Sequence, residues 1–334
     1  IKSIKGILVT SNTTSSYKIL HKLNLKKTVH QYYPIDHDFI VKKFLRHWQP
    51  SIAVFVDSEI WPSMFKFLKK FNISLIQLNT RITQKSFQRW MKLKNFSYSV
   101  FKNISASYPQ NNETNYYLKK FKVKKIKSIG NIKFIENKFH NEKIQKLNHK
   151  FKKYKTWVAA STHQGEEQFC AQAHLKLKKK IKNLITIIIP RHIHRVNEIS
   201  KELKALKLNI VLHSSNIKNL KNTDIYLVDT FGESKKFYKL SSSVFLGKSI
   251  NFKGGQNPLE ALHYGSQILH GPHVENFKDV YSYLKSLKAS KEVRNPDQLV
   301  KKLTFKKDKF IENKIKKIGN TIFKKTIKEI NQYI

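Results

Sequence analysis

The stretch Gly254-Gly255-Gln256-Asn257-Pro258-Leu259-Glu260 has the composition of a helix start that meets a ligand. Its two glycines allow close approach of the backbone, Asn257 suits a helix cap, and Pro258 suits the first turn. Unpaired N–H groups and the positive end of the helix dipole attract anions at such a start, most often phosphate. Glu260 would repel a phosphate, so it is better explained as an acceptor for a sugar hydroxyl. The stretch therefore predicts a nucleotide-binding loop, with an ordinary capped loop as the alternative.

Short apolar runs alternate with helix-period segments along the whole chain. In the first half we expect strands at residues 4–10, 28–33, 52–56, 73–78, 104–108 and 126–129, and helices at 39–47, 61–70 and 112–121. In the second half we expect strands at residues 157–160, 184–189, 209–213, 225–228, 244–246 and 267–269, and helices at 165–180, 194–206, 233–240, 258–264 and 277–287. This alternation predicts βαβ units and parallel sheets covered on both faces.

The length and a polar segment indicate two domains. A chain of 334 residues is long for one hydrophobic core, and 40% hydrophobic residues supply enough material for two. We expect Rossmann-like domains over residues 1–136 and 156–304, a lysine-rich linker over 137–155, and a basic helix over 305–334.

Four polar blocks follow expected strands of the second half. Ligands in open α/β sheets collect at the carboxyl ends of strands, so these blocks predict one common crevice. Arginine occurs at only six positions of this lysine-rich chain, and Arg191 at a strand end suggests a planar, bidentate donor to phosphate or carboxylate. An ordinary surface arginine is the alternative. The blocks are Ser161-Thr162-His163, Pro190-Arg191-His192, Thr230-Phe231-Gly232-Glu233 and Gly254-Gly255.

Seven blocks in one order resemble the 3-deoxy-D-manno-octulosonic acid (Kdo) transferases of lipopolysaccharide synthesis. The first block resembles the Glu-x-x-x-Trp-Pro region of this family, shifted here so that one acid, Glu59, is retained. The blocks are Asp57-Ser58-Glu59-Ile60-Trp61-Pro62, Asn79-Thr80-Arg81-Ile82, Gly130-Asn131-Ile132-Lys133-Phe134, Ala159-Ala160-Ser161-Thr162-His163-Gln164-Gly165-Glu166-Glu167, Ile189-Pro190-Arg191-His192, Val228-Asp229-Thr230-Phe231-Gly232-Glu233, and Gly254 to Glu260 with Gly271-Pro272-His273. The resemblance and the alternating pattern together imply an α/β GT-B glycosyltransferase, with two Rossmann-like domains facing a central crevice.

The resemblance implies that the domain over residues 1–136, incomplete at its amino terminus, binds the acceptor and that the domain over 156–304 binds the CMP-Kdo donor. It also implies roles for particular residues. Glu59 and Arg81 are implied to lie on the side of the site that binds the acceptor or the sugar. The implied donor-binding residues are Ser161, Thr162, Arg191, His192, Gly232, Glu233, Gly254, Gly255, Asn257, Glu260 and Asn276. The implied reaction moves Kdo from a CMP-Kdo donor to a lipid A precursor, with inversion at the anomeric carbon.

Some of these residues also have structural interpretations. Glu59 could cap the helix that begins near Trp61, Asp36 could do the same, and Asn276 could cap the helix that follows it. Ser161 lacks the surroundings of a hydrolase nucleophile, and its hydroxyl suits a cap. His192 and His194 lack a second cluster with zinc-like spacing, so we expect loop or capping roles, no metal and no cofactor.

The family typically begins with a membrane anchor and a Ser-x-Gly-Glu segment, whose glutamate the resemblance implies as catalytic base. Neither matches here, and the chain opens at Ile1 on a strand-like run. We expect the amino terminus to be truncated and the base to lie upstream of Ile1, with Glu59 the first candidate inside the chain. The chain as written should then bind CMP without transferring Kdo.

The formal charge of +43 favours anionic partners. It reflects either lysine-biased drift or a selected basic surface, and an anionic membrane surface suits it. Nucleic acid is an unlikely partner, because the lysines are scattered and no binding signature is present. No apolar run reaches the length of a membrane span, so we expect a soluble or peripheral protein. The resemblance implies that this truncated form is peripheral on the cytoplasmic face of the inner membrane. Two alternatives are another nucleotide-sugar transferase and a non-catalytic, basic anion-binding protein.

Overall fold

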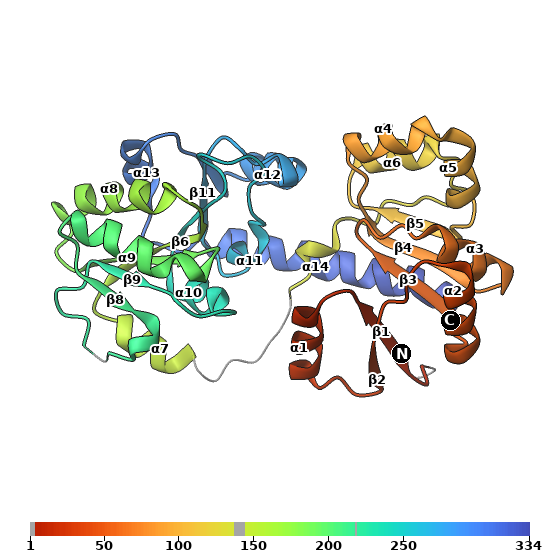
Figure 1. Cartoon of the computed structure of the whole chain (residues 1–334). Helices are drawn as coiled ribbons and strands as arrows, with labels where there is room; N and C mark the ends of the chain where they lie inside the picture. Colours follow the sequence, from red (N-terminus) through yellow and green to blue (C-terminus); the bar gives the residue numbers. More distant parts are fainter. Residues whose placement is uncertain (1–3, 137–143, 218) are drawn as a thin grey trace. The chain divides into compact units, whose positions relative to one another are not determined.

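The computed structural model describes residues 4–136, 144–217 and 219–334 and divides the chain into two compact units (Figure 1). Unit 1 consists of residues 1–132 together with 320–334, and unit 2 consists of residues 133–319.

Unit 1 contains two parallel sheets. The first pairs β1 (Ile7–Ser11) with β2 (Thr28–Tyr32), and the second has the order β3-β4-β5, with bounds Ile52–Val56, Ser74–Thr80 and Ala106–Pro109. Its helices are α1 (Thr14–Leu23), α2 (Asp38–Trp48), α3 (Pro62–Lys70), α4 (Gln84–Lys92), α5 (Lys94–Phe101) and α6 (Asn112–Lys120).

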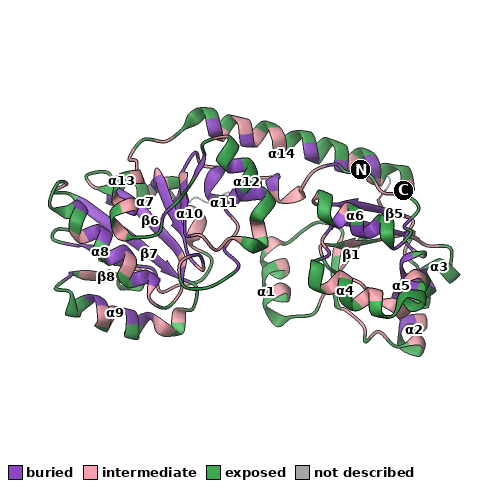
Figure 2. Cartoon of the chain, turned by 90° about the horizontal axis from the view of Figure 1, so that it is seen from above, coloured by how far each residue is buried: buried purple, intermediate pink, exposed green. Residues whose placement is uncertain are grey.

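The core of unit 1 is built on aromatic side chains of α3, α5 and the end of α6. Phe65, Phe101 and Phe121 are fully buried, and the rings of Phe101 and Phe121 stack with centroids 4.1 Å apart. Burial of such rings is a large share of the hydrophobic stabilisation of a domain. By contrast, β1, β2 and α1 contain no buried residue, as the green and pink of α1 show (Figure 2). The part of unit 1 formed by residues 7–32 is therefore held by few apolar contacts.

Unit 2 contains one parallel sheet of seven strands in the order β12-β11-β10-β6-β7-β9-β8. In chain order the strands are β6 (Lys155–Thr162), β7 (Leu184–Pro190), β8 (Ile210–Leu212), β9 (Ile225–Leu227), β10 (Ser243–Leu246), β11 (Gln267–His270) and β12 (Ser290–Glu292). Its helices are α7 (Ile144–Phe151), α8 (Glu166–Lys178), α9 (Val196–Ala205), α10 (Ser234–Leu240), α11 (Leu259–Leu262), α12 (Lys278–Ser286) and α13 (Pro296–Lys302).

Every residue of β7 is buried, which explains its continuous apolar sequence Leu-Ile-Thr-Ile-Ile-Ile-Pro. On one face of the sheet, Trp157 of β6 joins a core with Cys170 of α8 and Leu299 of α13. The unit thus has the covered parallel sheet that the sequence predicts.

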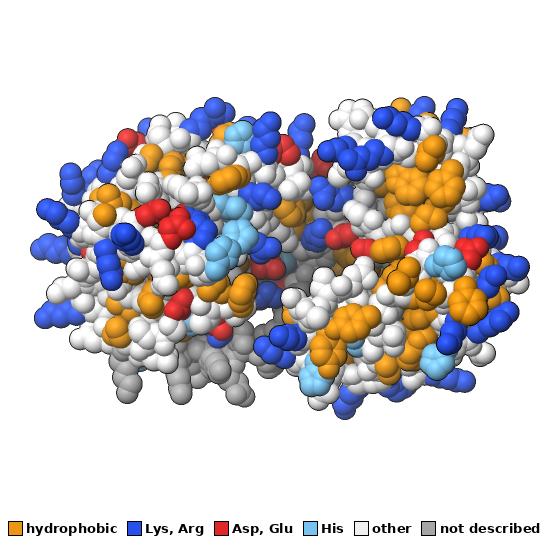
Figure 3. Space-filling view, in the orientation of Figure 1, with side chains coloured by type: hydrophobic (Ala, Val, Ile, Leu, Met, Phe, Trp, Pro, Cys, Tyr) orange, Lys and Arg blue, Asp and Glu red, His pale blue; other side chains and the backbone are white. Residues whose placement is uncertain are grey.

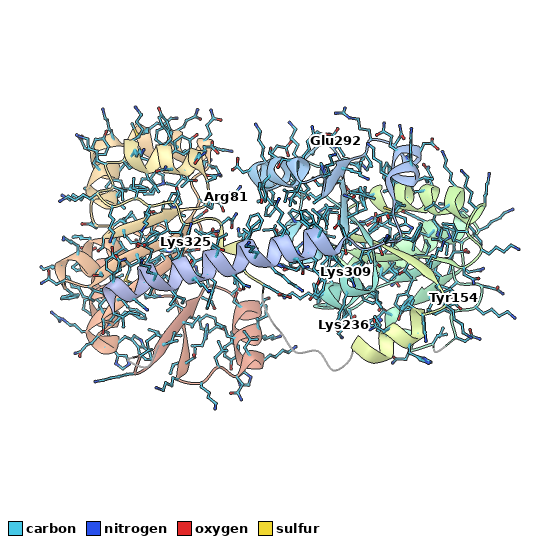
Figure 4. The ribbon with its side chains drawn as sticks, turned by 180° about the vertical axis from the view of Figure 1, so that it is seen from behind. Arg81, Tyr154, Lys236, Glu292, Lys309 and Lys325 are labelled. Carbon is cyan, nitrogen blue, oxygen red and sulfur yellow. The ribbon has the colours of Figure 1, made fainter. Side chains whose placement is uncertain are left out.

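The long helix α14 (Lys309–Ile330) contributes to both units, since its residues from 320 onward are assigned to unit 1. Figure 4 shows this helix from behind, with Lys309 and Lys325 labelled. Within unit 1 its Glu329 is buried, accepts a hydrogen bond from the Tyr108 hydroxyl at 3.1 Å and pairs with Lys127 Nζ at 2.5 Å. These bonds lower the pKa of Glu329, with the bond to Lys127 as the largest cause. They tie the end of α14 to β5.

The predicted α/β fold class is confirmed, and most expected strands and helices lie where the sequence places them. The expected strand 126–129 is wrong, because Ile126 makes only an isolated bridge to Ser107. The expected helix 258–264 is shortened to α11, and α1, α4, α5, β12 and α13 were not anticipated. Of the expected linker, residues 137–143 lie outside the described residues and 144–151 form α7. The assignment of an acceptor domain and a donor domain stays a prediction.

Candidate functional site

The sheet of unit 2 brings the expected donor-binding blocks to one edge. Its strands are parallel, so their carboxyl ends lie side by side. Thr162 at the end of β6 is in register with Pro190 of β7, and Leu246 of β10 is in register with both Ala160 and His270. The loops that begin after these strands therefore share one rim of the sheet.

The chain order of the strands reverses at β6, which has β7 on one side and β10 on the other. In open α/β sheets such a switch point, at the carboxyl ends of the strands, is the usual place for a ligand. The loops after β6 and β10 flank it, and the second of these contains Gly254-Gly255.

Glu166, at the start of α8, lies inside the protein at this switch point. Its carboxylate is fully buried and accepts four backbone N–H groups. Three come from the loop after β10, at 2.7 Å for Lys248, 2.9 Å for Ser249 and 3.0 Å for Ile250, and the fourth comes from His163 at 2.9 Å. Charge-assisted bonds of this kind are about twice as strong as neutral ones. Glu166 therefore acts as an internal anion that fixes two loops of the site. The sequence offered no signal for this role beyond an acid in a first turn.

Close packing around Glu166 requires a glycine at position 247. A Cβ atom there would come within 2.4 Å of the Ser161 carbonyl oxygen and 2.6 Å of Glu166 Oε2. The loop after β10 could not otherwise reach the carboxylate.

The start of α8 carries a second buried carboxylate, Glu167, which pairs with Arg195 Nη1 at 3.2 Å. Burial is the largest cause of the raised pKa of Glu167. Two acids at this helix start disfavour an anion there. Ser161 lies at the rim in a left-handed conformation, with φ of 54°, whereas the Thr162 side chain is fully buried. Their contribution to donor binding stays a prediction.

Arg191 and His192 are exposed directly after β7. The Arg191 N–H donates to the Thr162 carbonyl oxygen at 3.0 Å, which keeps the two strand ends together. No ion pair between described residues includes Arg191, so its guanidinium is available to a ligand.

Histidine side chains gather on this face of unit 2 (Figure 3). The His192 ring lies 5.5 Å from the rings of both His163 and His194. Burial is the largest cause of the lowered pKa of His163. His192 begins a short 3-10 helix without a side-chain capping bond, so its expected capping role is wrong and a loop position remains.

The glycine loop differs from its expected form. The Gly254 N–H donates to Glu275 Oε2 at 2.7 Å, and the Gly255 N–H donates to the Lys248 carbonyl oxygen at 2.9 Å. The expectation that these groups are unpaired is therefore wrong. Both glycines have positive φ, and a Cβ on Gly255 would lie 2.9 Å from Val274 Cα. The glycines are thus needed for packing against the segment after β11.

Pro258, and not Asn257, stands at the N-cap position of the helix after this loop, although Asn257 Oδ1 accepts from the Leu259 N–H at 3.2 Å. The helix α11 has only four residues, so its dipole is small. Glu260 is exposed within it. Asn276 lies beside the loop, because its N–H donates to the Gly254 carbonyl oxygen at 2.9 Å.

Gly232 and Glu233 lie beyond the end of β9, at the same rim. Gly232 has a positive φ of 81°, and a Cβ there would meet no atom within 4 Å. The Glu233 carboxylate contacts Lys236 Nζ and lies 3.9 Å from His213 Nε2. A nearby lysine thus offsets the negative charge of Glu233.

In unit 1, Glu59 and Arg81 follow the ends of the adjacent strands β3 and β4. Asp57, directly after β3, and Asn79, the residue before the last of β4, both have positive φ, and Asn79 Nδ2 donates to Asp57 Oδ1 at 2.6 Å. Asn79 Oδ1 also accepts from the Ile132 N–H at 3.0 Å. A side chain thus fixes the backbone from which Glu59 and Arg81 project.

The capping interpretation is correct for Asp36 and wrong for Glu59. The two Asp36 carboxylate oxygens accept from the N–H groups of Ser63 at 3.0 Å and Met64 at 2.9 Å, in the first turn of α3. Glu59 is exposed and accepts instead from Trp61 Nε1 at 2.6 Å.

Two further searches cover only the described parts of the chain. Within these parts, no three His, Cys, Asp or Glu side chains are grouped to hold a metal ion. None of the helices described there combines the length and apolarity needed to cross a membrane.

Comparisons with known proteins agree with the fold. A glycosyltransferase structure from Rickettsia africae matches with a TM-score of 0.59 at 13% identity, covering 98% of this chain and 90% of that one. A UDP-GlcNAc 2-epimerase structure from Neisseria meningitidis matches with a TM-score of 0.59 at 12% identity, covering 95% and 86%. These likenesses define an α/β protein of the GT-B class, which glycosyltransferases share with UDP-GlcNAc epimerases.

Sequence comparisons identify the family. Residues 2–136 match the family described as 3-deoxy-D-manno-octulosonic-acid transferase (kdotransferase). The 3-deoxy-D-manno-octulosonic acid transferase of Rickettsia bellii is 32% identical over 89% of this chain and 71% of its own length. That of Rickettsia felis is 33% identical over 89% of this chain, which spans 64% of that relative's length. The chain belongs to the Kdo transferase family.

Proposed function

We propose that this protein is a glycosyltransferase that moves Kdo from CMP-Kdo to a lipid A precursor, with inversion at the anomeric carbon. The observation that carries the proposal is the common rim of unit 2. The loop at Gly254 follows β10 and Arg191 and His192 follow β7, on the two sides of β6 at the switch point of the sheet. Family membership supplies the donor and the acceptor.

Arg191 is the group that we propose for the CMP phosphate. The N–H groups of Gly254 and Gly255 are already bonded within the protein, and buried acids stand at the start of α8. An exposed guanidinium, by contrast, offers two parallel donors to phosphate oxygens. We assign Glu260 to the ribose hydroxyls, because it is exposed just beyond the glycine loop. Ser161, Thr162, His192, Gly232, Glu233, Asn257 and Asn276 complete the proposed donor site.

In the proposed reaction an acceptor hydroxyl oxygen bonds to the anomeric carbon of Kdo while the bond from that carbon to the CMP phosphate oxygen breaks. The hydroxyl proton passes to a carboxylate, and Arg191 stabilises the negative charge of the departing CMP. Among these 334 residues Glu59 is the first carboxylate to examine as that base. Arg81, which follows the end of the neighbouring strand, is proposed to contact the acceptor or the sugar.

Calorimetry with CMP tests the donor site. Arg191→Lys keeps the charge but loses the bidentate geometry, so CMP binding should weaken by about 1–3 kcal/mol. Arg89→Lys on the exposed surface of α4 is the matched control and should leave the affinity unchanged. Equal affinities for the two variants would place Arg191 outside the site.

Glu260→Ala separates the ribose contact from the phosphate contact. It should weaken the binding of CMP but affect a ribose-free phosphate much less. Equal losses for both ligands would contradict the assignment of Glu260.

A transfer assay with radiolabelled CMP-Kdo and a lipid A precursor tests the reaction itself. Transfer that depends on Arg191 supports the proposal: if these 334 residues transfer Kdo, Glu59 is the first base to test, and if only a longer chain does so, the base lies outside them. If polyanions displace an anion bound to the protein and CMP does not, the protein would instead be a non-catalytic anion-binding protein. Transfer of a sugar from a nucleotide sugar other than CMP-Kdo would support the alternative of another nucleotide-sugar transferase. The proposed location is the cytoplasmic face of the inner membrane, where anionic lipids would attract the basic chain.

A further inference from the structure

A hollow of about 850 Å³ lies at the opposite edge of the sheet of unit 2. Ser266 and Gln267 stand at the start of β11, and Ala289 stands just before β12. All strands of the sheet are parallel, so this is the amino-terminal edge, away from the rim that carries Arg191 and the glycine loop. The hollow is therefore separate from the proposed donor site.

The lining of the hollow is strongly positive. Its single acid is Asp308, whose Oδ1 accepts from the Ile311 N–H at 3.0 Å in the first turn of α14. Its lysines are Lys288, Lys291, Lys306, Lys307 and Lys309. None of these five takes part in an ion pair between described residues. The hollow thus concentrates positive charge that the protein leaves unbalanced.

Lys307 differs from the other four because it forms part of the wall. Its Nζ donates to the carbonyl oxygens of Tyr238 at 3.3 Å, Lys239 at 2.8 Å and Tyr264 at 2.9 Å. These carbonyls end α10 and the turn after α11, so Lys307 fixes the local structure. The exposed Lys288, Lys291, Lys306 and Lys309 remain for a ligand.

Several lysines lie at the start of α14, together with the acids Asp308 and Glu312. The amino terminus of a helix is its positive end, and cations there are destabilising. Lys306 and Lys307 nevertheless precede this 22-residue helix, and Lys309 is its first residue. A bound anion would offset both the helix dipole and the mutual repulsion of the lysines.

We propose that this hollow is a second anion site, which binds a ligand with closely spaced phosphate groups. Its volume lies in the range of small-molecule sites, and several ammonium groups around one concave surface match several phosphate oxygens. The phosphates could belong to a soluble molecule or to a lipid headgroup, which present the same chemistry to Lys291 and Lys306. The site stands apart from the proposed transferase function and requires no reaction.

Pyrophosphate is the probe for the soluble ligand, measured by calorimetry at low salt. The double substitution Lys291→Gln with Lys306→Gln should weaken pyrophosphate binding by about tenfold or more, because two charged donors are lost. Lys201→Gln with Lys204→Gln on the exposed surface of α9 changes the net charge equally and should have little effect. Lys291→Arg with Lys306→Arg should retain most of the affinity.

Equal losses in the two glutamine variants would overturn the proposal, as would a failure of the unsubstituted protein to bind pyrophosphate. Both lysine pairs are exposed, so thermal unfolding should show the variants folded. CMP affinity should not change in the Lys291 and Lys306 variant. Loss of CMP binding together with pyrophosphate binding would show that the ligands share one site and would also overturn the inference.

Vesicles distinguish the two sources of phosphate. A lipid ligand predicts that the Lys291 and Lys306 variant sediments less with phosphatidylglycerol vesicles than the Lys201 and Lys204 variant does. A soluble ligand predicts equal sedimentation of the two variants, with the difference confined to pyrophosphate.

Discussion

Glu166 is the residue on which the rim of unit 2 depends most. A buried carboxylate that accepts four N–H groups has its charge compensated by dipoles of two loops, and no cation is needed. Removing that charge would leave buried donors without an adequate acceptor, which is costly. Gly254 and Gly255 follow three of these donors in the same loop after β10.

We predict that Glu166→Gln destabilises unit 2 by about 2–4 kcal/mol, because an amide oxygen cannot satisfy the donors that two carboxylate oxygens satisfy. Denaturant unfolding followed by the fluorescence of Trp157, the tryptophan of unit 2, would measure the loss. Glu198→Gln, on the exposed surface of α9, is the matched control and should cost less than about 0.5 kcal/mol. Similar values for the two variants would show that Glu166 is not an anchor.

We expect the side chain of Lys307 to make the stability of unit 2 depend on pH. Burial is the largest cause of the lowering of its pKa to about 8. Between this value and the unfolded lysine pKa of about 10.4, the unfolded chain holds a proton that the folded chain has released. Stability from this group therefore rises as the pH increases across that window.

The measurement is the free energy of unfolding of unit 2 at pH 7.5 and at pH 10. The rise between the two should be smaller in Lys307→Met than in the unsubstituted protein, because methionine cannot titrate. Lys204→Met, from the exposed surface of α9, should keep the full rise. An undiminished rise in Lys307→Met would contradict the assignment.

At the scale of elements, β1, β2 and α1 are the weak part of unit 1. They contain no buried residue, whereas six of the seven residues of β4 are buried. Segments with few buried apolar contacts open locally at a lower free energy than the core does. We predict that the amides of residues 7–11 and 28–32 exchange with deuterium well before those of 74–80, as followed by mass spectrometry. Equal protection of the three strands would show that unit 1 opens only as a whole.

The elements that the sequence predicted best are those with a strong local signal. Strand β7 is a run of buried isoleucines, and α3 begins at Pro62, so both could be located from composition and spacing. Strand β12 reads Ser-Lys-Glu and has no apolar signal, because it is short and lies at the edge of the sheet. The segment 126–129 is apolar enough for a strand but makes only one bridge.

The site was predictable in outline and not in detail. The end of an apolar strand was enough to place Arg191 and His192 at the candidate rim, because parallel strands bring their carboxyl ends to one edge, and their role in donor binding stays a prediction. The Lys248 N–H donates a hydrogen bond to Glu166 and the Gly254 N–H donates one to Glu275, so these bonds join segments that are far apart in the sequence. Pairings of that kind depend on tertiary packing, so they could not be read from composition. They also reverse the expectation for the glycine N–H groups.

At the scale of the whole molecule, the net charge of +43 decides how the chain meets surfaces. Attraction between lysines and anionic lipid is long-range but is screened by salt, with a Debye length of about 10 Å at 0.1 M. We predict that phosphatidylglycerol vesicles bind the protein at low salt and release it as the salt concentration rises. Neutral phosphatidylcholine vesicles serve as the control. Retention at molar salt would point to inserted apolar side chains instead.

Unit 1 is assembled from two separate stretches, and this has a consequence for the order of events on the ribosome. Unit 2 is continuous, whereas residues 4–132 are completed by residues 320–334. At about 5–20 residues per second, the earlier stretch waits roughly 10–40 s while unit 2 is translated. Tyr108 and Lys127 meet their partner Glu329 only after that delay. Chains that end before residue 320 and are released from the ribosome would therefore carry a complete unit 2 and an unfinished unit 1, which is the part that chaperones and proteases would recognise.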